Sequence, residues 1–147
     1  MFFGEYRHTL DPKGRLSIPG KLKEALVNGA HEILIVTKDF DTCLMAYPPE
    51  EWTRILEKAK GLPMTNPHVK NFNRHVVAPA MECLLDKQGR ILIPPSLRSY
   101  AKLNKEVVVL GMHYKIEIWD HKRWKEKEQQ INQSAQEIST ALASLGL

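Results

Sequence analysis

The chain repeats itself, and this repeat constrains the fold more than any other feature of the sequence. The segment 11–23 aligns without gaps on the segment 86–98, and six of the thirteen positions are identical. Further pairs extend the match: Ile33–Ile35 with Val108–Leu110 at the same offset and, after a slip of three residues, Tyr47 with Trp119 and Trp52 with Trp124. The match covers a module of about 45 residues and indicates an internal duplication.

Each copy predicts the same order of elements: a strand, a tight turn, a strand that ends at proline, a short helix and two more strands. β-branched and aromatic residues bounded by Gly, Pro, Asn and Asp support the strands. In the first copy we expect strands at 5–10, 15–18, 32–37 and 43–47, the turn at 11–14 and the helix at 20–27. In the second copy we expect strands at 80–85, 90–93, 106–111 and 115–119, the turn at 86–89 and the helix at 95–102.

A module of about 45 residues lies near the lower limit at which a chain without disulfides or metal buries enough apolar surface to fold. We therefore expect that neither copy folds alone and that the two copies share one core. The predicted fold is mainly β with α. It is a pseudo-twofold, barrel-like β body built from two internal repeats of a single polypeptide.

Helices are predicted between the copies and after the second one. Pro48–Trp52 opens a helix that runs to about Lys60, and Asn66 caps another that runs over 67–77. Asp120 caps a third helix, which continues to Leu145 without Gly or Pro. The predicted units are a first module at 5–52, a helical linker at 53–77, a second module at 78–124 and a C-terminal helix at 125–147.

The C-terminal helix carries an apolar stripe. Its members are Trp124, Ile131, Ala135, Ile138, Leu142 and Leu145. A helix packed on its own domain, a frayed tail and a seam with a neighbouring subunit all fit this pattern, because the stripe covers only about three heptads.

Composition and charge exclude several classes of protein. The 147 residues are 43% hydrophobic and 26% charged, which is typical of a globular chain and not of a disordered one. The apolar runs fall far short of the roughly 20 residues of a membrane-spanning helix, and the first residues do not resemble a secretory signal. We therefore expect a cytoplasmic protein with no membrane partner. The net charge of +4 is a weak indication of a nucleic-acid partner.

Neither the cysteines nor the common catalytic motifs indicate a metal site or an enzyme. Cys43 and Cys83 have no histidine at ligand spacing, so buried free thiols are expected. The sequence contains no Gly-x-Ser-x-Gly, His-Glu-x-x-His or Gly-x-x-x-x-Gly-Lys-Ser/Thr motif. We predict no enzyme, no metal, no cofactor and no small-molecule substrate.

Each copy contains the tight turn on which the functional prediction depends. Asp11–Gly14 has residues that a type I turn favours at three of its four places, and Asp86–Gly89 keeps the first and the last of these. A left-handed glycine lets the hairpin follow the twist of its strands. A β-branched residue at Gly14 or Gly89 should therefore disturb the turn.

The two turns also carry positive charge. They project Lys13, Lys87 and Gln88 into solvent, while Arg15 and Arg90 begin the returning strands. An exposed Asp–Arg pair that only ties the turn together is the ordinary explanation for such a hairpin. The duplicated charge favours a repeated anionic partner instead, because arginine offers the fork that reads guanine and lysine offers a point charge for phosphate.

The paired Asp-x-x-x-Arg motifs, each followed by a hydrophobic strand and a proline, resemble the MraZ family, whose modules are similar to swapped-hairpin AbrB-type DNA-binding domains. The likeness extends from Phe3 to Trp124. It implies a nucleoid-associated bacterial regulator that binds double-stranded DNA at promoter repeats as a ring-like homo-oligomer and represses its own division and cell-wall operon. The DNA-facing residues implied by position are Lys13, Gly14, Arg15, Lys87, Gln88, Gly89 and Arg90, and Asp11 and Asp86 would shape the turns.

The two copies differ in ways that matter for this interpretation. The second turn has Lys87-Gln88 where the first has Pro12-Lys13, so its tip should be less rigid. Leu92 replaces Ser17, which predicts that the second of the two strands is the more buried. The sequence leaves open whether one turn reads DNA while the other serves assembly. The alternative function is an antitoxin-like protein-interaction module in which the segment 120–147 binds another protein.

Overall fold

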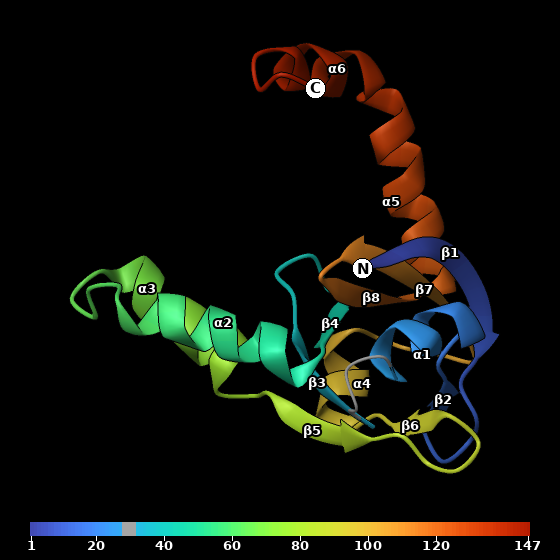
Figure 1. Ribbon diagram of the computed structural model, residues 1–147. Helices are drawn as coiled ribbons and strands as arrows, with labels where there is room; N and C mark the ends of the chain where they lie inside the picture. Colours follow the sequence, from blue (N-terminus) through green and yellow to red (C-terminus); the bar gives the residue numbers. More distant parts are fainter. Residues whose placement is uncertain (28–31) are drawn as a thin grey trace.

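The computed structural model describes residues 1–27 and 32–147, and six of its strands form one antiparallel sheet (Figure 1). In spatial order these strands are β1 (Phe2–Thr9), β7 (Glu106–His113), β8 (Lys115–Asp120), β4 (Leu44–Tyr47), β3 (Ile33–Lys38) and β5 (Met81–Leu84). Two short strands, β2 (Arg15–Ser17) and β6 (Arg90–Leu92), pair with each other in a separate ribbon. The prediction of a mainly β fold with helices, made from two repeats, is confirmed.

Each repeat completes the sheet of the other. Strand β1 of the first repeat pairs with β7 of the second, and β5 of the second repeat pairs with β3 of the first. The backbone groups at a strand edge need hydrogen-bond partners, and here each repeat supplies the strand that covers the other's edge. This exchange is the physical reason to expect that neither copy folds alone.

Two strand pairings show the pseudo-twofold relation of the repeats. In the ribbon, Leu16 lies opposite Ile91, and Arg15 faces Leu92 just as Arg90 faces Ser17. In the large sheet, β4 and β8 pair around Met45 and Glu117 in the same reciprocal manner. Equivalent residues of the two repeats are therefore related by the pseudo-twofold axis both in the ribbon and in the large sheet.

The register corrects one part of the gapless alignment. Ile35 pairs with Tyr47 in the first repeat as Val108 pairs with Trp119 in the second, so Ile35 corresponds to Val108 and not to Leu110. The reason is that the first repeat has two more residues between its proline, Pro19, and this strand. The gapless alignment therefore matched these two strands two residues out of register.

The main core lies where the ribbon, the large sheet and two short helices meet. The helices are α1 (Gly20–Val27) and α4 (Pro95–Tyr100), and they contribute Leu22 and Leu97 to it. Leu16 and Ile91 at the centre of the ribbon are fully buried in the same cluster. Each such side chain contributes about 1.5 to 3 kcal/mol when it leaves water, so this shared core joins the two repeats.

The ribbon also overturns the prediction about Leu92. Its side chain is 56% exposed, so the prediction that the second strand is the more buried is wrong. The pairing explains the error, because Leu92 sits opposite Arg15 on the outer face while the neighbouring Ile91 points into the core.

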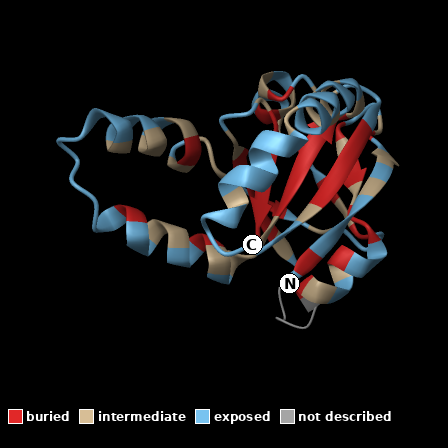
Figure 2. Cartoon of the chain, turned by 90° about the horizontal axis from the view of Figure 1, so that it is seen from above, coloured by how far each residue is buried: buried red, intermediate tan, exposed pale blue. Residues whose placement is uncertain are grey.

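The linker forms a helical arm that projects from the body (Figure 2). It consists of α2 (Pro49–Lys60), α3 (Pro67–Phe72) and a π-helical turn, η1 (Asn73–Val77), which continues α3 to the predicted end. Asn66 caps α3 by accepting a hydrogen bond from the His68 backbone N–H. Trp52 and Val76 pack with Tyr47 in a second, smaller core that attaches the arm to the sheet.

The C-terminal segment is two helices and not the one that the sequence predicts. Helix α5 (His121–Gln133) ends at Ser134, and α6 (Ala135–Ala143) continues at an angle to it (Figure 1). Ser134 has φ −99° and ψ 10°, which interrupts the helix. Serine is a weak residue for a helix interior because its hydroxyl competes for backbone hydrogen bonds.

Two further predictions can be compared with the structure. Cys43 and Cys83 are buried free thiols, as expected. Within residues 1–27 and 32–147, no helix has both the length and the apolar character to cross a membrane.

Candidate nucleic-acid interface

The two tight turns have the same hydrogen-bond network. In the first turn, residues 11–15, the Gly14 N–H donates to the Asp11 carbonyl at 2.9 Å and the Asp11 N–H donates to the Arg15 carbonyl at 3.0 Å. In the second turn, residues 86–90, the matching bonds are 2.9 and 2.8 Å long. Both turns are therefore closed hairpins of one backbone design.

The leading aspartate organises each turn with its carboxylate. One oxygen of Asp11 accepts from the backbone N–H groups of Lys13 and Arg15, both at 2.9 Å. The other oxygen accepts from Arg15 Nε at 2.6 Å. Asp86 repeats the pattern: Gln88 and Arg90 donate their backbone N–H groups at 2.8 and 3.0 Å, and Arg90 Nε donates at 2.9 Å.

These hydrogen bonds change the electrostatics of the aspartates. The Arg15 backbone N–H is the largest cause that lowers the pKa of Asp11 below its ordinary value of 3.8, and the Arg15 side chain adds to it. Arg90 lowers the pKa of Asp86 in the same way. Both carboxylates are therefore ionised at neutral pH and hold the base of each arginine side chain in place.

The arginines keep their outer nitrogens for another partner. Each pairs with its aspartate through Nε, and no described residue is hydrogen-bonded to the Nη groups of Arg15 or Arg90. The forked end of a guanidinium is the part that recognises guanine or phosphate. The Asp–Arg pair therefore orients the fork without using it.

The turn glycines adopt the left-handed conformation, with φ +87° at Gly14 and +74° at Gly89. Both are buried, because each lies beneath a basic side chain of the opposite repeat. A Cβ at Gly14 would come within 2.5 Å of Arg98 Cζ, and a Cβ at Gly89 would come within 2.8 Å of Lys23 Nζ. Arg98 lies on α4 and Lys23 on α1, so the two cations cross between the repeats.

Backbone hydrogen bonds also connect each turn to the opposite repeat. The Ile93 N–H donates to the Gly14 carbonyl at 2.9 Å, and the Ile18 N–H donates to the Gly89 carbonyl at 3.0 Å. Each turn is therefore supported by the strand end and the helix of the other repeat. Each basic tip is a composite of both repeats.

Lys23 and Arg98 are the residues that the sequence prediction of the site missed. They are equivalent positions at the last place of the aligned segments, and both are basic, which is the signal that could have indicated them. The Arg98 Nε atom is buried and finds no hydrogen-bond partner in the part of the chain that the structure describes. A buried guanidinium nitrogen without a partner is uncommon.

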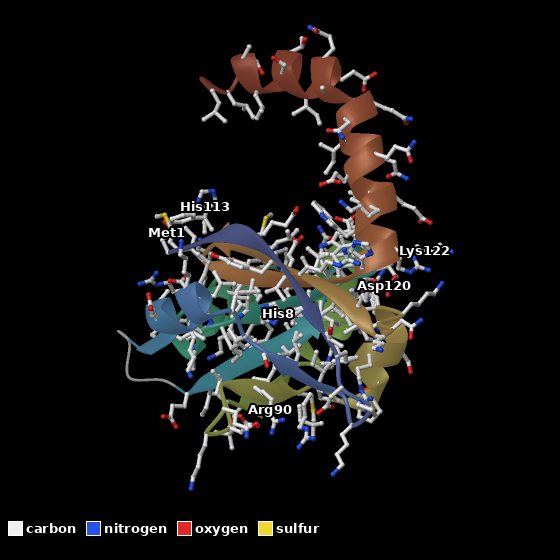
Figure 3. The ribbon with its side chains drawn as sticks, turned by 90° about the vertical axis from the view of Figure 1, so that its right-hand side faces the viewer. Met1, His8, Arg90, His113, Asp120 and Lys122 are labelled. Carbon is white, nitrogen blue, oxygen red and sulfur yellow. The ribbon has the colours of Figure 1, made fainter. Side chains whose placement is uncertain are left out.

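The predicted basic residues lie together at one end of the molecule. Strands β2 and β6 bring the two turns to the end opposite α5 and α6 (Figure 1), and Arg90 marks that end in Figure 3. Lys13, Lys87 and Gln88 are exposed there. The end therefore presents two related sets of positive charge to solvent.

Among the described residues, the one group close enough to share a metal ion is Asp39, Cys43 and Glu117, far from the turns in sequence. Lys115 Nζ already lies 3.9 Å from the Asp39 carboxylate and 3.7 Å from that of Glu117. Burial raises the pKa of the Cys43 thiol, which disfavours the thiolate that a metal requires. The Lys115 ammonium group therefore supplies to this cluster the positive charge that a metal ion would otherwise bring.

Comparison with known proteins decides the family. Residues 1–75 and 76–144 each match the family described as "MraZ protein, putative antitoxin-like". The chain belongs to the MraZ family. The prediction of this family from the two Asp-x-x-x-Arg motifs is confirmed. The boundary between the two matched MraZ copies falls inside η1, at the end of the arm.

Curated MraZ relatives align with the chain along its whole length. Proteins named "Transcriptional regulator MraZ" from Heliobacterium modesticaldum and Acetivibrio thermocellus are each 44% identical over 147 residues, with 100% of both chains covered. The protein of the same name from Alkaliphilus oremlandii is 45% identical with the same coverage. Because MraZ proteins are regulators and not enzymes, the prediction that this chain is not an enzyme is confirmed.

Proposed function

We propose that this MraZ protein is a sequence-specific transcription regulator that binds double-stranded DNA with the end that carries its two turns. The observation that carries the proposal is the pair of composite basic tips, each built from a turn of one repeat and a cation of the other. Two equivalent sets of positive charge on one rigid core suit a polyanion with a regular repeat. The names of the MraZ relatives support the same function.

Different residues would perform different parts of the recognition. Arg15 and Arg90, oriented by their aspartates, would offer a fork to guanine edges in the major groove, and Gln88 would suit adenine. Lys13 and Lys87 would contact phosphates as point charges. Gly14 and Gly89, buried beneath Arg98 and Lys23, would let these two cations lie close against the DNA-facing turns, while Asp11 and Asp86 keep the turns closed.

Lys23 and Arg98 extend the proposed DNA-facing set. Each lies against the glycine of the opposite turn, so a DNA backbone that approaches the turn also approaches the cation above it.

We also propose that the protein acts as a ring-like homo-oligomer on promoter repeats, in the cytoplasm and at the nucleoid, and that it represses its own division and cell-wall operon. A single pair of turns buries little surface, whereas several copies facing tandem elements make the later contacts intramolecular. Oligomerisation would then be part of recognition.

Binding-site selection from random duplex DNA, followed by sequencing, tests this function. We expect a short motif that recurs at a fixed spacing, and we expect Arg15→Ala to weaken gel-shift affinity for the selected DNA. Arg74→Ala is the matched control, because Arg74 is an exposed arginine on the arm, away from the turns. Equal affinity of the folded Arg15→Ala variant and the control would count decisively against the proposal.

An antitoxin-like role is the second candidate. The observation that favours it is the exposed apolar stripe on α5 and α6, which a different protein would cover. Stoichiometric co-purification of a second protein would support this role, whereas a large homogeneous particle of one chain would support the ring.

A further inference from the structure

A hollow in the surface runs from the first turn to the start of α5. One part, of about 550 Å³, lies between the segment 9–12 and the segment 103–105. The other part, of about 400 Å³, lies between Lys102, the segment 104–106 and the segment 120–122. Both parts are lined by Asn104 and Lys105, so they form one continuous hollow along the side of the body.

The sheet brings the two ends of this hollow close together. Thr9 at the end of β1 pairs with Glu106, and Asp120 at the end of β8 pairs with Val107. Neighbouring strands are about 5 Å apart, so the start of α5 lies about 10 Å from the end of β1. Figure 3 shows Lys122 at the side of the body, pointing away from it.

Three exposed lysines line the hollow: Lys102, Lys105 and Lys122. We call this set the first flank, because it adjoins the first turn. Within residues 1–27 and 32–147, none of the three forms an ion pair. The first flank therefore adds three positive charges to those of the turn.

The carboxylates that line the hollow are already bound by other groups of the chain. Glu106 accepts from Arg7 Nη2 at 2.9 Å. Asp120 accepts from the backbone N–H groups of Asn104 and Arg123, both at 3.3 Å. Asp11 closes the first turn. The charges that the hollow offers to an outside partner are therefore those of the lysines.

The backbone at Lys102 supports a role for its side chain. Lys102 follows Ala101, the last residue of α4, and has φ +53°. Glycine is the usual residue at this place after a helix, because a side chain there is strained. The chain nevertheless carries a long cation at this position, and strained residues are often functional.

The equivalent places beside the second turn carry the opposite charge. The Leu10 N–H donates to the Lys105 carbonyl and the Leu85 N–H to the Glu32 carbonyl, both at 2.7 Å, so Lys105 corresponds to Glu32. Lys122 and Glu50 each lie three residues after the paired positions Trp119 and Tyr47. Both glutamates are exposed. The flank beside the first turn is therefore basic, and its counterpart is acidic.

We propose that the first flank binds the phosphate backbone of duplex DNA outside the bases that the turns read. The inference rests on the proposed function and adds the path of the DNA along the protein. Lysine supplies a point charge that suits a phosphate, and about 10 Å of one strand spans about three nucleotides. Glu32 repels phosphates at the equivalent place, so the contacted DNA extends beyond the motif on the side of the first turn only.

A double charge reversal tests the proposal. Lys105→Glu with Lys122→Glu gives the first flank the residues of its counterpart. On a duplex that carries the selected motif between long flanking sequences, this variant should bind more weakly, and its slope of log affinity against log salt should fall by about two. Lys58→Glu with Lys60→Glu is the matched control, because it makes the same change of charge at exposed lysines of the arm.

Shortening the duplex locates the contact. Removing the base pairs outside the motif on one particular side should weaken wild-type binding by the same factor as the double reversal does on the long duplex. The double-reversal variant should lose little affinity on that shortened duplex. Removing the base pairs on the other side should leave the wild type unaffected. Far-UV circular dichroism confirms that each variant is folded.

The outcomes separate this inference from the proposed function. If the double reversal behaves like its control while Arg15→Ala still weakens binding, the inference is wrong and the proposed function stands. If the wild type binds no duplex, both fail. If the double reversal, but not the control, changes the mass of the DNA-free protein in light scattering, the first flank contacts another copy of the chain, and this result also overturns the inference.

Discussion

The first and second turns have nearly the same backbone and different chemistry. Their corresponding hydrogen bonds differ by no more than about 0.3 Å, down to the two N–H groups held by each aspartate. The side chains around them have diverged. The first turn combines Lys13 and Arg15 with Arg98, and the second combines Lys87, Gln88 and Arg90 with Lys23.

The two repeats share the geometry of the turn and differ in the cation that lies over it. The geometry that presents an arginine fork is the same in both repeats. The identity of the supporting cation is not the same, and the first turn, with two guanidinium groups and the rigid Pro12, is better suited to read bases. The second turn, with Lys87 and Lys23 beside Arg90, offers more flexible amines for phosphates.

The largest difference between the turns should appear when a side chain is added at the glycines. Valine at Gly14 must adopt a positive φ and displace a planar guanidinium, and we expect a loss of about 2 to 4 kcal/mol in the free energy of unfolding. Valine at Gly89 has the same backbone strain but meets the end of a flexible lysine, so the loss should be about 1 kcal/mol smaller. Urea denaturation of both variants measures the difference. Equal losses would show that Arg98 does not hold the first turn more tightly than Lys23 holds the second.

The next effect concerns DNA affinity. Arg15→Ala should cost about 1 to 3 kcal/mol per engaged turn, with relaxed preference at one base position. Arg90→Ala should also relax the preference at one base position, but it should cost less, because Arg90 has a lysine beside it where Arg15 has a second guanidinium, that of Arg98. Gel shifts with the selected motif and with single-base variants distinguish these effects. A larger and more base-specific loss for Arg90→Ala would reverse the roles assigned to the two turns.

The lysines should produce a smaller change, visible chiefly in the salt dependence. If Lys13 neutralises one phosphate, Lys13→Ala should lower the slope of log affinity against log salt by about one. Lys87→Ala should do the same if the second turn also lies on DNA. Titrations at several salt concentrations provide the slopes, and an unchanged slope for Lys87→Ala alone would assign the second turn to assembly.

The sequence was sufficient for the turns because their structure is local. Asp11, Pro12 and Gly14 define the hairpin within a few residues, and the repeat at Asp86 and Gly89 doubles the evidence. The same local chemistry identified the caps at Asn66 and Asp120, whose side chains accept from backbone N–H groups as expected.

The features that the sequence did not reveal depend on long-range topology. The exchange of β1 and β5 places Arg98 over the first turn and Lys23 over the second, and no local pattern reports which repeat a side chain will contact. Leu92 illustrates the same limit, since its exposure follows from its partner strand and not from its hydrophobicity. The break at Ser134 was missed because a stripe of apolar residues continues across it.

The smallest expected difference between the turns is their response to acid. The native pKa values of Asp11 and Asp86 are lowered, so each carboxylate stabilises the fold above the ordinary value of 3.8 and loses this contribution as the pH falls through the native value. Asparagine keeps one oxygen for the backbone N–H groups, but it removes the charge and replaces the oxygen that accepts from the arginine Nε by an amide NH2 group, which cannot accept a hydrogen bond. The stability difference between wild type and Asp11→Asn should therefore be constant at neutral pH and shrink in acid.

Asp86→Asn should show the same trend with a similar amplitude, because the two ion pairs are about equally exposed: 28% for Asp11 and 35% for Arg15, against 38% for Asp86 and 27% for Arg90. Water therefore screens the two pairs to a similar extent. Urea denaturation at about pH 7 and about pH 3 tests both variants. A stability difference that grows in acid would mean that the charge on the aspartate opposes the turn, and that the Asp–Arg pair does not hold the fork in place.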